Sequence, residues 1–103
     1  MILHMAIFRW KDGTTDEQVA AAAAALNALP AQIAELRAYT AEPNLRVRPG
    51  ADFGVTAVVD DEAAVNGYLD HPAHTAAVEQ FLAPIIAERS AVQIPFELGR
   101  PGQ

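Results

Sequence analysis

Apolar residues occupy almost every position from residue 2 to residue 10, on both alternating sets. Side chains of a strand point to opposite faces with a period of two, so a strand that is apolar on both sets is buried on both faces. We therefore predict a central strand at the start of the chain. One of its faces carries Ile2, His4, Ala6, Phe8 and Trp10, and the other carries Leu3, Met5 and Ile7.

A helix is predicted to follow, from Thr14 or Thr15 to about Leu29. A threonine followed by acidic residues is typical of a helix start, because the hydroxyl caps a free N–H and the acids face the positive end of the dipole. Pro30 should end the helix, since proline lacks the N–H that the helix needs. Residues 20–25 are all alanine, which gives high helix propensity but little bulk for packing.

The remaining chain shows the pattern of three more strands and two helices. We predict strands at residues 36–42, 53–59 and 91–98, a short helix capped by Asp60 or Asp61, and a helix from His71-Pro72 to Pro84. One antiparallel sheet with helices on one face satisfies this order. The predicted fold is therefore α+β, a single ferredoxin-like domain over residues 1–98 with a tail at residues 99–103.

The second face of this sheet has no helix to cover it. Leu3, Met5 and Ile7, or their neighbours on the other alternating set, are nevertheless apolar on that face. An apolar patch of this size is rarely left in water, and packing against a second copy would hide it. We therefore expect a homodimer joined through the sheet faces, in the form of a dimeric α/β barrel.

The composition and net charge of the chain exclude several classes of binding partner. The chain of 103 residues has a formal net charge of -6, which argues against nucleic acid and against anionic membrane surfaces. No apolar run is long enough for a membrane span, no secretory signal is evident and there is no cysteine, so we expect a cytoplasmic protein. No glycine-rich phosphate loop is present, and we expect no cofactor. Arg46 and Arg48 lie in a loop that is either solvated or in contact with an acidic substrate.

Three histidines and one tyrosine are the candidates for chemistry. His4 lies early in the first strand, while Tyr68, His71 and His74 cluster around the start of the last predicted helix. Histidine exchanges protons near neutral pH, and a tyrosine hydroxyl can donate a hydrogen bond to a developing oxyanion. These residue types therefore suit proton transfer at a carbon next to a carbonyl group.

Structural roles are also open for the same residues. His71 can be a helix cap and nothing more, His4 a satisfied strand residue, and Tyr68 a core residue. A zinc site built on His71 and His74 would need further ligands, which the sequence does not indicate, so we predict no metal.

Three segments resemble the stress-responsive A/B barrel (Dabb) family. They are residues 2–11, the Leu29-Pro30 helix end, and the run from Tyr68 to His74 with the pattern Tyr-x-x-His-Pro-x-His. Together they extend the resemblance over nearly the whole chain. The resemblance implies a dimeric barrel of ferredoxin-like subunits.

The resemblance also implies an active site. One plant relative, olivetolic acid cyclase, is a polyketide cyclase that works by intramolecular aldol condensation, and its catalytic residues resemble His4, Tyr68 and His74. Carried over, His74 would be the general base, Tyr68 would polarise the carbonyl and His4 would hydrogen-bond the substrate. The pocket would bind an apolar or aromatic small molecule and is expected to include His71, Ala6, Phe8, Ala22, Ala23, Leu26 and Val55. The cyclase has bulky aromatic residues where Ala22, Ala23 and Leu26 stand here, so the pocket should differ in shape.

Three functions remain open at this point. The first is a small-molecule enzyme with histidine-based proton abstraction, such as polyketide cyclisation. The second is a non-catalytic, stress-associated protein that binds a ligand in the same pocket. The third is a cofactor-independent monooxygenase of the related dimeric barrel families, which share the architecture more than the His-Pro-x-His segment.

Overall fold

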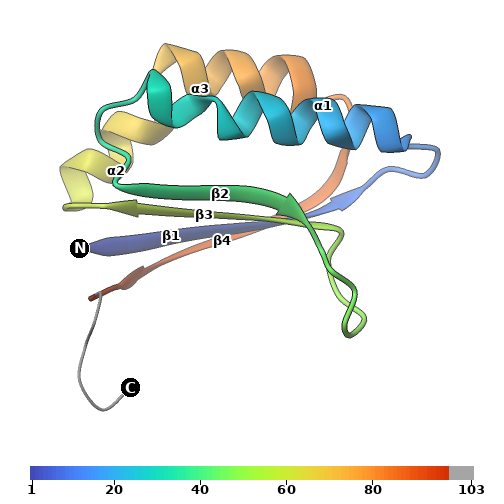
Figure 1. Ribbon diagram of the computed structural model, residues 1–103, viewed down its shortest axis with the longest axis horizontal. Helices are drawn as coiled ribbons and strands as arrows, with labels where there is room; N and C mark the ends of the chain where they lie inside the picture. The colour runs from blue at the N-terminus through green and yellow to red at the C-terminus, as the bar shows by residue number, and fades with distance from the viewer. Residues whose placement is uncertain (98–103) are drawn as a thin grey trace.

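A computed structural model describes residues 1–97, which form one antiparallel sheet with a layer of helices on one of its faces (Figure 1). The described elements are β1 (Ile2–Trp10), α1 (Asp16–Asn27), a 3₁₀ turn (Leu29–Ala31), β2 (Ala38–Pro43), β3 (Phe53–Val59), α2 (Glu62–Leu69), α3 (Pro72–Ala77), a π-helical segment (Val78–Leu82) and β4 (Ile86–Pro95). The predicted tail at residues 99–103 lies outside the described residues.

The strand order is β2-β3-β1-β4, and every neighbouring pair is antiparallel. β3 returns between β1 and β2, and β4 pairs with the free edge of β1. This is the ferredoxin-like arrangement, so the predicted α+β fold class is confirmed. β1 lies inside the sheet, as its two apolar faces required.

Several predicted boundaries need correction. The helix predicted to end at Pro30 ends at Asn27, and Pro30 lies in the 3₁₀ turn instead, where a proline near the first position needs no N–H donor. β2 starts at Ala38 rather than residue 36. The last helix turns from α to π geometry after Ala77.

The largest error concerns β4, which was predicted at residues 91–98 and begins at Ile86. Its early residues include Glu88 and Arg89, which interrupt the apolar pattern. They nevertheless pair in register with β1, Glu88 opposite Arg9 and Arg89 opposite Phe8. Every residue of β4 after Ile86 is exposed, so pairing with β1 holds this strand rather than burial of its side chains.

Local hydrogen bonds explain how α1 is placed. Thr15 and Gln18 form a reciprocal capping box at its start, which satisfies two free N–H groups. At the other end, the amide of Asn27 pairs with the backbone of edge strand β2: Nδ2 donates to the Ala41 carbonyl at 2.7 Å, and Oδ1 accepts from the Ala41 N–H at 3.1 Å. The helix is thereby tied to the strand beneath it.

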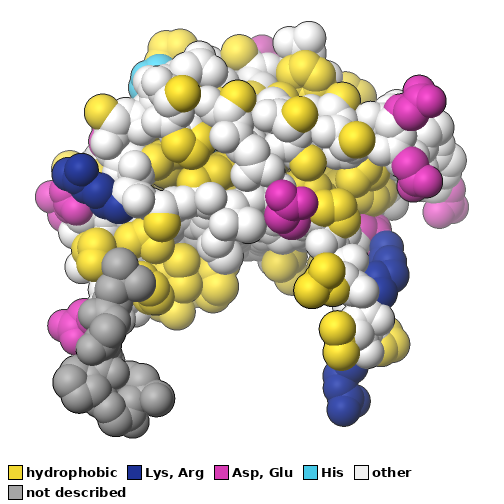
Figure 2. Space-filling model, in the orientation of Figure 1, with side chains coloured by type: hydrophobic (Ala, Val, Ile, Leu, Met, Phe, Trp, Pro, Cys, Tyr) yellow, Lys and Arg dark blue, Asp and Glu magenta, His cyan; other side chains and the backbone are white. Residues whose placement is uncertain are grey.

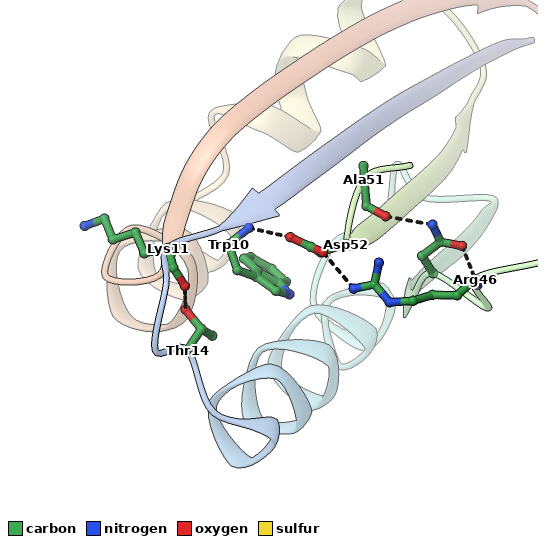
Figure 3. Close-up of polar contacts among 7 residues, drawn as sticks. Trp10, Lys11, Thr14, Arg46, Ala51 and Asp52 are labelled. Atoms are coloured by element: carbon green, nitrogen blue, oxygen red, sulfur yellow. Dashed lines mark hydrogen bonds and ion pairs between the residues drawn. The ribbon is translucent and has the colours of Figure 1, made fainter. Parts of the chain in front are cut away.

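The loop between β2 and β3 leaves the sheet on the side away from the helices (Figure 1). Asp52 anchors it to the end of β1, since its carboxylate accepts hydrogen bonds from the Trp10 N–H at 2.8 Å and from the Arg46 guanidinium at 2.7 Å (Figure 3). The hydrogen bond from Arg46 holds the pKa of Asp52 below its ordinary value. Arg46 is therefore engaged in holding its own loop.

The helix-free face of the sheet is apolar, as predicted. Its exposed members include Ile7, 50% exposed, and Val92, 47% exposed, with Ile94 beside them. These side chains belong to the set of β1 and β4 residues that points away from the helices, and Figure 2 shows apolar side chains on this underside of the sheet. In residues 1–97, no helix is long and apolar enough to cross a membrane.

Candidate functional site

A cavity of about 170 Å³ lies between the helix layer and the sheet. Residues from all four strands and all three helices line it: His4, Ala6, Phe8, Leu26, Tyr39, Val55, Tyr68, Leu69, His74, Val78, Leu82, Ile86 and Arg89. Most of these side chains are apolar, with a few polar groups among them, which is the usual composition of a small-molecule site. An apolar cavity of roughly 150 Å³ can hold one benzene molecule, so a group the size of one ring fits here.

His74 enters the cavity from the first turn of α3. Its Nδ1 lies 3.0 Å from the backbone carbonyl of Leu69, the last residue of α2. A carbonyl oxygen can only accept, so Nδ1 must carry the hydrogen. In the neutral ring the lone pair is then on Nε2, which has no hydrogen-bond partner among residues 1–97. His74 is thus held in the tautomer that can accept a proton.

His4 approaches from β1 and is held in the opposite tautomer. Nε2 of the Gln93 amide donates to His4 Nδ1 at 2.9 Å, so neutral His4 carries its hydrogen on Nε2. Gln93 stands opposite His4 in the register of β1 and β4. His4 is only 2% exposed and is the one buried polar or charged residue in the described part of the chain. One histidine can therefore accept a hydrogen bond while the other can donate one.

Tyr68 lies between the two histidines. Its ring meets His4 edge to face with the centroids 5.8 Å apart, and it meets His74 at 4.8 Å. On another side Tyr39 of β2 packs against it at 6.1 Å. The Tyr39 hydroxyl is buried and makes no hydrogen bond of good geometry with any described residue, although its phenol interacts electrostatically with that of Tyr68.

Burial sets the protonation states of these groups. It lowers the pKa of His4 and of His74, because a cation is poorly solvated there, and the positive charge of Arg89 lowers both further. The hydrogen bond to Leu69 opposes this effect at His74 without reversing it. Burial also raises the pKa of Tyr68 and of Tyr39. At neutral pH the cavity therefore holds two neutral imidazoles and two protonated phenols.

The comparisons with known proteins agree with this architecture. Residues 2–96 match the sequence model of the Stress Responsive A/B Barrel Domain (Dabb) family. The chain belongs to the Dabb family. The resemblance seen in the sequence is thereby confirmed.

Three similar proteins illustrate the family and the fold. An uncharacterized protein of Streptomyces coelicolor is 38% identical over 94 residues, covering 85% of this chain and 97% of that protein. A dimeric ferredoxin-like protein of unknown function from Thermobifida fusca is 43% identical with a TM-score of 0.84, covering 92% of this chain and 90% of that one. The hydroxynitrile lyase of Passiflora edulis shares the fold, with a TM-score of 0.78, 14% identity and coverage of 97% and 96%.

The structure of this Dabb chain brings together most of the residues named from sequence. His4, Tyr68 and His74 line one cavity, and so do four of the expected binding residues, Ala6, Phe8, Leu26 and Val55. The other three expected binding residues, Ala22, Ala23 and His71, do not line the cavity. Ala22 is buried in the core of the helix layer, and Ala23 packs against that core, because α1 reaches the cavity through Leu26.

His71 also lies outside the cavity lining. Its Nδ1 accepts from the Ala73 N–H at 3.0 Å and caps α3, so the helix-cap role that the sequence left open is confirmed. In the described residues, no three His, Cys, Asp or Glu side chains are grouped so as to hold a metal ion.

Sequence reasoning missed two polar members of the lining, Tyr39 and Arg89. Tyr39 carries no motif, and only its position on the helix-facing set of β2 could have indicated it. Arg89 received no assignment, because it falls between the helix predicted to end at Pro84 and the strand that was predicted to start only at residue 91. With the correct start, its register opposite Phe8 would have placed it on the cavity side.

Proposed function

We propose that this Dabb protein is a small-molecule enzyme in which His74 removes a proton from a carbon next to a carbonyl group. The observation that carries the proposal is the hydrogen bond from His74 Nδ1 to the Leu69 carbonyl. It orients the ring, leaves the Nε2 lone pair without a protein partner, and does so beside a phenol that can donate to an oxyanion. Base and oxyanion donor thus share one cavity, as proton abstraction requires.

The roles of the other groups follow from their hydrogen positions. As the C–H bond breaks, its electron pair moves toward the carbonyl carbon and negative charge develops on the oxygen. Tyr68 can donate its hydroxyl hydrogen to that oxygen, and His4 can donate from Nε2 because Gln93 occupies its Nδ1. The proton stays on His74 as imidazolium until a later step takes it back.

Ring closure is the most specific form of this proposal. The enolate carbon attacks a second carbonyl group of the same substrate molecule, and the resulting alkoxide takes the proton that His74 holds. Loss of water and enolisation of the remaining ring ketones then give an aromatic ring, which completes a polyketide-type aldol cyclisation. That a lyase from Passiflora edulis has the same fold supports an enzymatic use of this architecture.

We also propose that the active form is a homodimer joined through the helix-free sheet face. Support comes from the apolar side chains exposed there, including Ile7, Val92 and Ile94, and from a 43% identical relative described as dimeric. Burying this face against a second copy removes an apolar patch from water. The predicted dimeric barrel has this geometry.

The test is deuterium exchange into the methyl group of acetophenone, a one-ring ketone that the cavity can hold. Purified protein is incubated with the ketone in D₂O and exchange is followed by NMR. We expect exchange above the buffer rate, a loss of roughly 10² to 10⁴-fold in His74→Ala, and a smaller loss in Tyr68→Phe. Exchange at the buffer rate with wild type would contradict the proposal.

The matched comparison is His71→Asn, which removes the neighbouring imidazole while asparagine still caps the helix. The proposal requires the loss at His74 to exceed the loss at His71 by at least an order of magnitude. Equal losses would show that exchange depends on the fold of this segment rather than on a base at residue 74. Circular dichroism on each variant separates misfolding from lost chemistry.

A further inference from the structure

We propose that the substrate of this site is a small aromatic or apolar ketone that also carries a carboxylate, and that Arg89 binds the carboxylate at the mouth of the cavity. The inference rests on the proposed function for the ketone, while the carboxylate is inferred from Arg89 and its surroundings. It names a binding residue that neither the sequence motifs nor the family description indicates.

The position of Arg89 identifies the mouth. Of the thirteen lining residues it is the only exposed one, and the other twelve are buried or half-buried. β4 is also the strand that the helices leave uncovered, since its side chains are exposed from Ala87 onward (Figure 1). A ligand that enters from this edge passes the guanidinium before it reaches the histidines.

The charge of Arg89 has no partner in the described chain. Its side chain makes no ion pair or hydrogen bond with any of residues 1–97, although the sequence has 13 acidic residues against 7 basic ones. The adjacent Glu88 points to the opposite face, because strand side chains alternate, and there it lies 3.8 Å from Arg9. In a chain with a net charge of -6, a cation without a counter-ion at a cavity mouth is suited to an anionic ligand.

The inside of the cavity fits the rest of such a molecule. No acidic side chain lines it, although Asp70, next to the cavity, acts electrostatically on His74. Its apolar walls and volume of about 170 Å³ suit one ring, and Arg89 is close enough to act electrostatically on His4, Tyr68 and His74. A ring in the cavity would then join a ketone at the histidine end to a carboxylate at the mouth. Arginine binds carboxylates through paired charge-assisted hydrogen bonds.

The experiment uses 4-acetylbenzoate and 4-acetylbenzamide, which share ring and ketone and differ in charge. Dissociation constants are measured by NMR titration of the full chain, which needs no turnover. Wild type should bind the carboxylate roughly ten- to hundredfold more tightly than the amide. Arg89→Gln should lose that preference while keeping its affinity for the amide. Arg48→Gln, which removes the same charge from the β2–β3 loop, should keep the preference.

Each other outcome overturns the inference. Wild type that binds the two probes equally, or binds neither, shows that no carboxylate is recognised. A preference retained in Arg89→Gln assigns it to another group, and a change only in dimer stability assigns Arg89 to the subunit interface. The two proposals can fail separately. A preference for the carboxylate without deuterium exchange refutes only the proposed proton abstraction. Deuterium exchange with equal binding of the two probes, or with a preference that does not depend on Arg89, refutes only this inference.

Discussion

The Tyr39 hydroxyl offers a direct test of how the site is built, because it is buried in the cavity wall and makes no hydrogen bond of good geometry within the described chain, although it interacts with the Tyr68 phenol. A buried hydroxyl without a partner costs roughly 1 to 3 kcal/mol in mutational data. The neighbouring Tyr68 phenol and the partial exposure of the Tyr39 ring favour the low end of that range. Tyr39→Phe removes the hydroxyl and keeps the ring.

We therefore expect Tyr39→Phe to be more stable than wild type by about 1 kcal/mol in the free energy of unfolding. For a domain of about 100 residues this corresponds to a rise in Tm of roughly 4 to 8 °C. The gain should be accompanied by weaker binding of 4-acetylbenzoate if the hydroxyl serves the ligand. A stabilising change that costs function is the expected signature of a binding group.

The assay is thermal unfolding followed by circular dichroism at one fixed protein concentration, because association with a second copy makes Tm concentration-dependent. Tyr39→Leu is the control, since it also removes the edge-to-face packing on Tyr68 and should be destabilising. An unchanged or lower Tm in Tyr39→Phe would refute the reasoning, because the hydroxyl would then be satisfied in the folded protein.

Two further predictions concern protonation and assembly. Deuterium exchange should fall as the pH drops through the pKa of His74, with a midpoint below the ordinary 6.5. Burial and Arg89 lower this pKa more than the Leu69 carbonyl and Asp70 raise it, and Tyr68 stays protonated throughout this range. A midpoint of the exchange rate above pH 6.5 would contradict the assignment of His74 as the base. Because the pKa of His74 is lowered in the folded protein, its contribution to the free energy of unfolding is fully present above about pH 6.5 and is lost as the pH falls through the lowered pKa. Ile7→Lys places a charge on the helix-free face and should weaken the dimer more than tenfold, measured by analytical ultracentrifugation. Gln80→Lys, on the helix side, should leave the dimer unchanged. A dimer of unchanged stability in Ile7→Lys would show that the helix-free face is not the interface.

The sequence predicted the fold well where a single physical pattern dominates. The two apolar sets of residues 2–10 and the β-branched run at residues 53–59 gave strands with the observed bounds. His71-Pro72 marked the start of α3 because both residues suit a helix N-terminus. Each of these signals acts over a few neighbouring residues, so the sequence alone contains it.

The prediction was less complete where the structure of a segment is set by residues that are distant in the sequence. Residues 86–90 form a strand because β1 pairs with them, and their exposed side chains leave no apolar pattern to detect. Arg89 was missed for that reason. The hydrogen positions on His4 and His74 depend on Gln93 and on the Leu69 carbonyl, which no spacing rule connects to them. The sequence indicated which residues could do chemistry, and the fold supplies their orientation.

The alternation of β1 links the proposed site to the proposed dimer. His4, Ala6 and Phe8 point into the cavity, while Ile7 and its neighbours on the other set point to the helix-free face. β4 carries Gln93, which hydrogen-bonds His4, and Arg89, which lines the mouth of the cavity, yet its side chains are the least covered of any strand. A second copy packed on the helix-free face would cover Val92 and Ile94 and so hold β4 in register. Dimerisation should therefore stabilise the orientation of His4 and Arg89 without contributing any group to the cavity, because the residues that it covers alternate along β4 with those that face the ligand.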